Sequence, residues 1–108
     1  MQLIEKGEHE ITRQQLGRMG WTMLHMMTGS FPEEITPELR QKWNAFLILF
    51  GQFYPCKICS QHFLQMLKSV EPFSGDSKEH LMKYLCELHN RVNRRLNKPM
   101  HNCDKVKN

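Results

Sequence analysis

The sequence lacks several features that define whole classes of protein. No apolar run approaches the ~20 residues that a transmembrane helix needs, so no membrane partner is expected. The first six residues mix acidic and basic side chains and lack the apolar core of a signal peptide. There is no Gly-rich phosphate loop, internal repeat or low-complexity linker. No segment alternates convincingly between polar and apolar residues, so we expect no β-strands.

The composition is that of one globular domain. Of the 108 residues, 40% are apolar and 24% charged, which is typical of a folded chain rather than a disordered one. The formal net charge is +4, but the only tight basic cluster consists of Arg91, Arg94, Arg95 and Lys98. Such a cluster is more often a solvated helix face than a phosphate-binding patch, although a bound anionic cofactor would also fit it. We therefore expect no nucleic-acid partner.

Apolar residues recur at helical spacing in four segments. Thr12 and Gln15 have the pattern of a capping box, and Thr36-Pro37 and Ser77 are further start signals. The predicted helices cover about residues 12–27, 36–53, 56–67 and 77–96, followed by a short element around 103–106. We predict an all-α fold, a four-helix bundle with a short fifth helix. Residues 1–11 are predicted to be a flexible N-terminal arm and residues 12–108 the domain.

Four cysteines are the most informative residues of the chain. They allow three pairings, and so many in a short chain indicate an oxidising compartment or a metal. Cys56 and Cys59 lie one turn apart, directly after Pro55, at the start of the third predicted helix. The unpaired N–H groups and the dipole of a helix N-terminus stabilise a thiolate. We therefore interpret this pair as a redox-active disulfide.

The same spacing is half of a zinc site, so a second interpretation stays open. Cys56, Cys59, Cys86 and His89 have the ligand types and pair spacings of a structural Cys3His site. The protein would then be a non-catalytic zinc-binding module. This interpretation leaves Cys103 without a role.

A second group of polar residues lies on the fourth predicted helix. Cys86, His89, Asn90 and Asn93 are three and four residues apart, which places them on one helix face. Polar side chains directed at a core need partners, and a bound ligand rich in donors and acceptors would supply them. A solvated polar stripe would satisfy the same groups, and the chemistry alone does not separate these alternatives.

Several motifs occur in a fixed order along the chain. They are Tyr54-Pro55-Cys56-x-x-Cys59, then Cys86-x-x-His89-Asn90-x-Val92-Asn93-x-x-Leu96-x-Lys98-Pro99, and then Cys103. Upstream stand Leu16-Gly17-Arg18-x-x-Trp21-x-x-Leu24-His25 and Phe31-Pro32. Over residues 12–104 this ordered set resembles the Erv/ALR family of FAD-dependent sulfhydryl oxidases.

The resemblance implies a homodimeric helical bundle with FAD at the bundle mouth. It assigns cofactor contacts to Arg18, Trp21, His25, Tyr54, Cys86, His89, Asn90, Asn93 and Lys98. It makes Cys56 and Cys59 the catalytic pair and Cys86–Cys103 a structural disulfide. Taken alone, Trp21 and Tyr54 would more often be core residues, and His25 a satisfied core histidine. The apolar stripe of the second helix, expected to be core or dimer interface, comprises Leu39, Trp43, Phe46, Leu47, Phe50 and Phe53.

The implied reaction oxidises dithiols of a protein substrate to disulfides. A substrate thiolate attacks Cys56, expected to carry the more accessible sulfur, and Cys59 leaves as a thiolate that passes two electrons to FAD. The final acceptor is oxygen, which gives hydrogen peroxide, or cytochrome c. All four cysteines then have a role, so none is left for the shuttle Cys-x-x-Cys arm common in the family, and the family's aromatic and basic tail after Cys103 is missing. The motif context favours the mitochondrial intermembrane space, with the endoplasmic reticulum and viral factories as alternatives.

Overall fold

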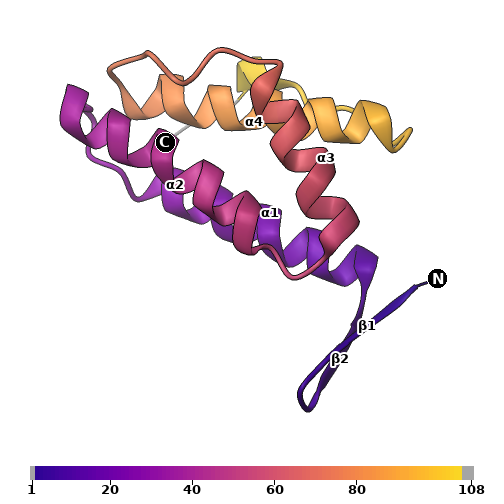
Figure 1. Cartoon of the computed structure of the whole chain (residues 1–108). Coiled ribbons are helices and arrows are strands. Elements are labelled where there is room, and N and C mark those ends of the chain that lie inside the picture. Colours follow the sequence, from indigo (N-terminus) through magenta and orange to yellow (C-terminus); the bar gives the residue numbers. More distant parts are fainter. Residues whose placement is uncertain (1, 106–108) are drawn as a thin grey trace.

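A computed structural model describes residues 2–105 as four α-helices, a short 3-10 helix and an N-terminal hairpin. The helices are α1 (Arg13–Gly29), α2 (Pro37–Phe53), α3 (Lys57–Lys68), α4 (Lys78–Arg95) and the 3-10 helix η1 (Cys103–Lys105). In Figure 1, α3 bridges from the end of α2 to α4. The predicted four-helix bundle with a short fifth helix is confirmed for these residues. Residue 106, the end of the last predicted element, lies outside the described residues.

The helices begin where the sequence supplies caps. At α1, the Gln15 N–H donates to Thr12 Oγ1 (3.0 Å) and the Thr12 N–H donates to Gln15 Oε1 (2.8 Å), so both halves of the capping box form. Thr36 and Ser77 cap α2 and α4 through their side-chain oxygens. Each such cap contributes about 1 kcal/mol by satisfying an otherwise unpaired N–H group. The start positions predicted for these helices are confirmed.

The expectation that the chain contains no strands is wrong at the N-terminus. The strands β1 (Leu3–Lys6) and β2 (His9–Thr12) pair antiparallel, and Gly7 adopts a φ of 61° in the turn between them. Glycine takes this backbone conformation without steric cost, which suits it to a tight hairpin turn. In Figure 1 the hairpin projects away from the helices.

The hairpin was not predicted because its sequence gives a weak strand signal. Each strand has only four residues, and Ile4 opposite Ile11 is the only pair in which both residues are apolar. No other part of the described chain forms a sheet with it, and isolated two-stranded hairpins are only marginally stable in water. The division of the chain after residue 11 stays a prediction.

The hydrophobic core is built from α1, α2 and α4 together with the loops that join the helices. Its fully buried leucines come from all three helices, and one isoleucine and two aromatic residues complete it: Leu24, Leu47, Leu81, Leu85, Leu88, Ile35, Trp43 and Phe73. Truncating one such leucine to alanine typically costs 2–5 kcal/mol, or about a third of the stability of a small domain. Among the described residues, no helix is long and apolar enough to cross a membrane.

The predicted apolar stripe of α2 is only partly a core stripe. Trp43 and Leu47 are buried, whereas Phe53, the last residue of the helix, keeps 80% of its surface exposed. The backbone leaves the helix at Tyr54, and Phe53 stands beyond the core at this end of α2. Met19 and Met23, which share the helical spacing of α1, are also exposed.

Candidate functional site

A disulfide joins Cys56 to Cys59 at the start of α3. Cys56 is the N-cap of the helix, and its Sγ accepts the Cys59 N–H at 3.4 Å. Ser60 fixes the first turn to α2, because its hydroxyl donates to the Gly51 carbonyl at 2.5 Å. The predicted position of the pair at a helix N-terminus is confirmed, and the free N–H groups there stabilise a thiolate formed on reduction.

Cys56 is the less exposed of the two cysteine residues in this chain by itself, and the expectation that it carries the more accessible sulfur stays a prediction. Cys56 is 8% exposed, whereas Cys59 is partly exposed. The reason is the N-cap position, in which the Cys56 side chain turns back over the helix end toward the Cys59 N–H. Cys59 lies inside the helix, on the face that carries Phe63 one turn later.

Tyr54 anchors the segment before the disulfide to α1. Its hydroxyl donates to the Leu16 carbonyl at 2.7 Å, and its ring lies so close to Gly20 that a Cβ there would stand 2.7 Å from the phenolic oxygen. Burial raises the pKa of the Tyr54 phenol, which therefore stays a neutral donor. The Cys56 N–H in turn donates to the Tyr54 carbonyl at 2.9 Å. The disulfide is thus held against the first half of α1.

Aromatic rings lead from the disulfide to the middle of α1 and α4. The ring of Phe63, one turn after Cys59, packs edge-on against Trp21 with 6.2 Å between centroids. Trp21 stacks on His89 with centroids 4.2 Å apart and planes 8° from parallel. The structure therefore brings together residues of three helices that lie far apart in the sequence.

Three imidazoles form a cluster at this point, which we call the histidine cluster: His25, His89 and His101. His25 Nε2 and His89 Nδ1 share a hydrogen bond at 3.1 Å, and the His89 and His101 ring centroids are 5.0 Å apart. Burial, together with the nearby His25, His101 and Lys98, lowers the pKa of His89 to about 4. Burial also lowers the pKa of His25. The His89 ring is consequently neutral at pH 7.

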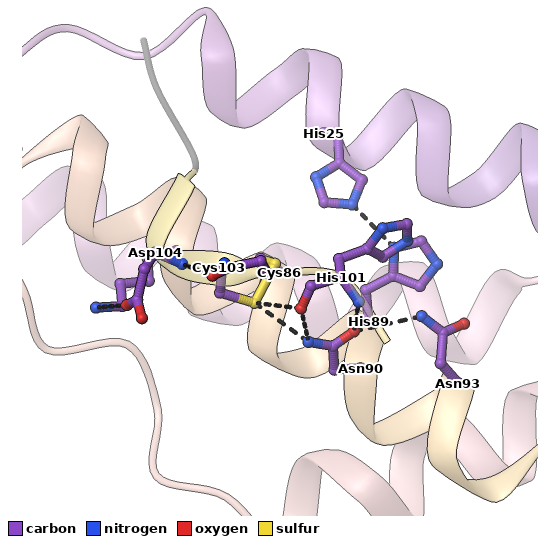
Figure 2. Close-up of a disulfide and its surroundings, with 10 residues drawn as sticks. His25, Cys86, His89, Asn90, Asn93, His101, Cys103 and Asp104 are labelled. Atoms are coloured by element: carbon purple, nitrogen blue, oxygen red, sulfur yellow. Dashed lines mark hydrogen bonds and ion pairs between the residues drawn. A yellow bond between two sulfur atoms is a disulfide. The ribbon is translucent and has the colours of Figure 1, made fainter. Parts of the chain in front are cut away.

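Asn90 fixes the position of His101 (Figure 2). Its side-chain nitrogen donates to the His101 carbonyl and its side-chain oxygen accepts the His101 N–H, both at 2.8 Å. The disulfide between Cys86 and Cys103, with 5.6 Å between Cα atoms, joins the same segment to α4. Asn90 was predicted as a cofactor contact, yet both polar atoms of its side chain bond the protein's own backbone. Asn93 is buried and donates to Asn90 Oδ1 at 3.4 Å.

Of the two predicted cationic contacts, Lys98 acts on the cluster and Arg18 lies further along α1. Lys98 contributes to the lowered pKa of His89, and its N–H donates to the Asn93 carbonyl at 2.8 Å. Arg18 is exposed on α1, three residues before Trp21. Sequence reasoning missed Phe63 and His101. The spacing of Phe63 from Cys59 could have indicated it, whereas His101 reaches the cluster only through the backbone held by Asn90 and Cys103.

The zinc interpretation is wrong for this structure. It requires Cys56, Cys59, Cys86 and His89 to meet as ligands, but the first two are joined to each other and Cys86 is joined to Cys103. No group of three or more ligand-type side chains in the described part of the chain is placed to hold a metal ion. The Cys86–Cys103 pairing implied by the family resemblance is present instead.

The chemistry of this donor set suits a planar, conjugated ligand that also carries anionic groups. Neutral aromatic faces stack on planar rings, and the cations of Arg18 and Lys98 suit negative charge. Since Trp21 and His89 already stack at 4.2 Å, a further ring has no space between them and would lie on an outer face of the cluster. The disulfide stands one helical turn from Phe63, which contacts Trp21.

Comparison with known proteins indicates the family of the chain. The sequence model of the Erv1 / Alr family matches residues 18–108. The FAD-linked sulfhydryl oxidase ERV1 of Arabidopsis thaliana is 34% identical over 104 residues, which are 96% of this chain and 54% of that protein. The mitochondrial FAD-linked sulfhydryl oxidase erv1 of Schizosaccharomyces pombe is 42% identical over 90 residues, 82% of this chain and 50% of that protein. The chain thus spans about half the length of these relatives.

A solved structure gives the same result for the fold. The FAD binding domain of Erv1 from Saccharomyces cerevisiae superposes with a TM-score of 0.78 at 35% identity, covering 87% of this chain and 89% of that one. The family match covers both cysteine pairs and all three residues of the histidine cluster. The chain therefore belongs to the Erv1 / Alr family.

Proposed function

We propose that this chain is a FAD-dependent sulfhydryl oxidase that converts protein dithiols to disulfides. The observation that carries the proposal is the Cys56–Cys59 disulfide at a helix N-terminus, one turn from the ring that contacts Trp21. A reducible disulfide beside a site suited to a planar ligand is the arrangement that this reaction needs. Relatives of the same family are named FAD-linked sulfhydryl oxidases, which supports the proposal.

The cofactor site is proposed to be the outer face of the histidine cluster and its surroundings. Trp21, His25 and His89 would offer ring faces, and Asn93 would offer an amide beside them. Arg18 and Lys98 would pair with phosphate charge. Three predicted contacts would support the site indirectly, because their polar atoms or sulfur already bond other parts of the protein. The Tyr54 hydroxyl bonds the Leu16 carbonyl, the Asn90 amide bonds the His101 backbone, and the Cys86 sulfur is joined to Cys103.

The proposed thiol chemistry uses both cysteines of the pair. A substrate thiolate attacks Cys56 Sγ, a new disulfide forms between substrate and Cys56, and Cys59 leaves as a thiolate. A second substrate thiol then attacks the mixed disulfide, which releases the oxidised substrate and leaves Cys56 and Cys59 reduced. FAD, when bound, supplies the two-electron acceptor that reoxidises the pair. Oxygen, giving hydrogen peroxide, or cytochrome c is the proposed final acceptor.

The assignment of Cys56 to the substrate and of Cys59 to the cofactor rests on the side to which each cysteine faces, and not on how exposed it is. Cys59 lies on the α3 face of Phe63, whose ring contacts Trp21, so the cofactor side of the disulfide is the Cys59 side. The bound cofactor would then cover the surface of Cys59 that is exposed in the chain alone. Substrate is left with Cys56, which it would reach from the loop side of the helix end.

The proposed assembly is a homodimer through α1 and α2. A groove of about 620 Å³ runs between these helices, lined mainly by apolar residues that include Met27, Phe31 and Phe46. Met19, Met23 and Met26 are each more than half exposed beside or within it. An apolar face of this size is the kind of surface that a second copy covers. Sedimentation at increasing protein concentration tests the proposal, and a Met23→Lys variant should remain monomeric.

The proposed location is the mitochondrial intermembrane space. The Schizosaccharomyces pombe relative is named as mitochondrial, and the two disulfides require a compartment that preserves them. Fractionation of the native cells with protease protection of the intact organelle would test this assignment.

The visible spectrum of the purified protein tests the proposed function. We expect a flavin band near ~450 nm that bleaches with dithiothreitol under nitrogen and returns with air. A Cys59→Ser variant should keep the yellow colour and lose dithiol oxidation, because Cys56 is then a free thiol and no disulfide bond is present for the substrate thiolate to attack. Retained turnover in that variant, or a colourless wild-type protein after reconstitution with FAD, would refute the proposal.

A further inference from the structure

Two large apolar side chains that are close in sequence to the redox disulfide are exposed. Phe53, three residues before Cys56, is 80% exposed, the highest value for a large apolar residue in the described range. Ile58, between Cys56 and Cys59, is 45% exposed. We call this pair the disulfide rim. Lys57, the remaining residue between the two cysteines, is also exposed.

The fold does not account for the disulfide rim. Neither side chain belongs to the hydrophobic core or packs against it. Phe53 has no ring contact within residues 2–105, whereas Phe50, one turn earlier, contacts Tyr54 and Phe63. A solvent-exposed phenylalanine and isoleucine next to a reactive disulfide therefore have no evident role in folding.

Disulfide exchange brings the rim into contact with the substrate. The attacking sulfur must come within bonding distance of a cysteine of the pair, so residues beside the substrate cysteine lie within a side-chain length of residues beside the disulfide. The disulfide segment is anchored on its inner side, where Tyr54 bonds α1 and Ser60 bonds α2. The substrate must approach from outside, and Phe53 and Ile58 are the exposed large apolar residues within three positions of the disulfide cysteines.

We infer that the disulfide rim is the docking surface for the substrate polypeptide, and that preferred substrate cysteines are flanked by large apolar residues. This inference rests on the proposed thiol exchange at Cys56 and Cys59. Contact with an apolar flank buries the exposed surface of Phe53 and Ile58, and that burial stabilises the encounter. A small dithiol without flanking residues gains nothing from the rim.

A binding experiment tests docking without any turnover. Two short peptides are compared, one with leucines on both sides of a central serine and one with serines throughout, the central serine replacing cysteine so that no exchange occurs. Fluorescence anisotropy with the full-length, FAD-reconstituted protein should show the leucine peptide binding about tenfold more tightly, the scale of one or two apolar contacts. The double variant Phe53→Ser and Ile58→Ser should lose this preference. The control Leu3→Ser, which alters an apolar residue of similar exposure on the hairpin, should keep it.

A kinetic experiment then separates docking from catalysis. With cysteine restored to both peptides, the double variant should lose the preference for apolar flanks in kcat/KM while its oxidation of dithiothreitol stays within about twofold of wild type. Equal binding of both peptides to wild type, or an unchanged preference in the double variant, would overturn the inference. If a second copy of the chain covers the rim, the double variant shifts the sedimentation profile and leaves the peptide preference intact, which also overturns it. Absence of dithiothreitol oxidation by wild type would refute the proposed function, and the binding result would still decide the docking.

Discussion

Replacing Gly20 with alanine tests whether Tyr54 holds the redox disulfide against α1. A Cβ at this position would lie 2.7 Å from the Tyr54 hydroxyl oxygen and 2.9 Å from Cε1, so the ring must shift. The shift breaks the 2.7 Å hydrogen bond from the Tyr54 hydroxyl to the Leu16 carbonyl. Overpacking costs roughly 1–3 kcal/mol and the lost hydrogen bond about 1, while removing a glycine from a helix returns about 1. The expected net loss is therefore about 1–3 kcal/mol.

The matched control is Gly17→Ala on the same helix. Apart from its chain neighbours and the backbone of its own helix, no atom lies within 4 Å of the position that its Cβ would occupy, so only the helix-propensity gain of about 0.5–1 kcal/mol remains. Urea unfolding of the oxidised proteins, followed by circular dichroism, measures both changes. The two variants should move in opposite directions, with Gly20→Ala less stable than wild type and Gly17→Ala more stable. A Gly20→Ala protein as stable as the control would refute the argument that Tyr54 occupies that space.

Three further changes have defined outcomes. Replacing the second disulfide through Cys86→Ala and Cys103→Ser should cost about 3 kcal/mol in urea unfolding, because the bond closes a loop across a sequence separation of 17; an unchanged midpoint would contradict this. The pKa of His89 is lowered from 6.5 to about 4 in the folded protein. Between these two pH values the His89 ring is protonated in the unfolded chain and neutral in the folded one, so the free energy of unfolding should fall as the pH drops from 6.5 to 4 and level off below that. For a half-exposed ring the loss is discounted to roughly 1–2 kcal/mol, and a His89→Gln variant should show a flatter profile of melting temperature against pH. In the hairpin, a hydrogen bond with Glu5 raises the pKa of Glu10 directly opposite, so the folded strands hold that proton more tightly than the unfolded chain. Strand protection in amide exchange, corrected for intrinsic rates, should be greatest at low pH and fall as the pH rises through the raised pKa, and Glu10→Gln should remove this dependence.

The helical part of the fold was predictable because its signals are local. Thr12, Thr36 and Ser77 cap helices through bonds to residues only three positions away, so a short sequence window contains both partners. The Cys56–Cys59 site was predictable for the same reason. The hairpin was not, because Ile4 and Ile11 provide too little alternation to stand out from a polar segment.

The parts of the site that depend on tertiary contacts needed the structure. His101 reaches His89 only because Asn90 and Cys103 bring a late segment back over α4. The family resemblance named Asn90 as a cofactor contact but could not tell that its amide is already occupied. The burial of Cys56 follows from a rotation of its side chain toward the Cys59 N–H, which no sequence pattern specifies.

Asn90 fixes the position of residue 101 through the backbone, so this position does not depend on which side chain the residue carries. At residue 101 the amide bonds the backbone N–H and carbonyl and no side-chain atom, and nearly every amino acid possesses these two groups. Any residue other than proline at this position would be delivered to the same place beside His89, with its own charge, size and polarity. Substitutions at position 101 therefore change the surroundings of His25 and His89 and leave the backbone of the segment in place. Both evolution and protein engineering can use this position to vary the charge, size or polarity beside the two rings.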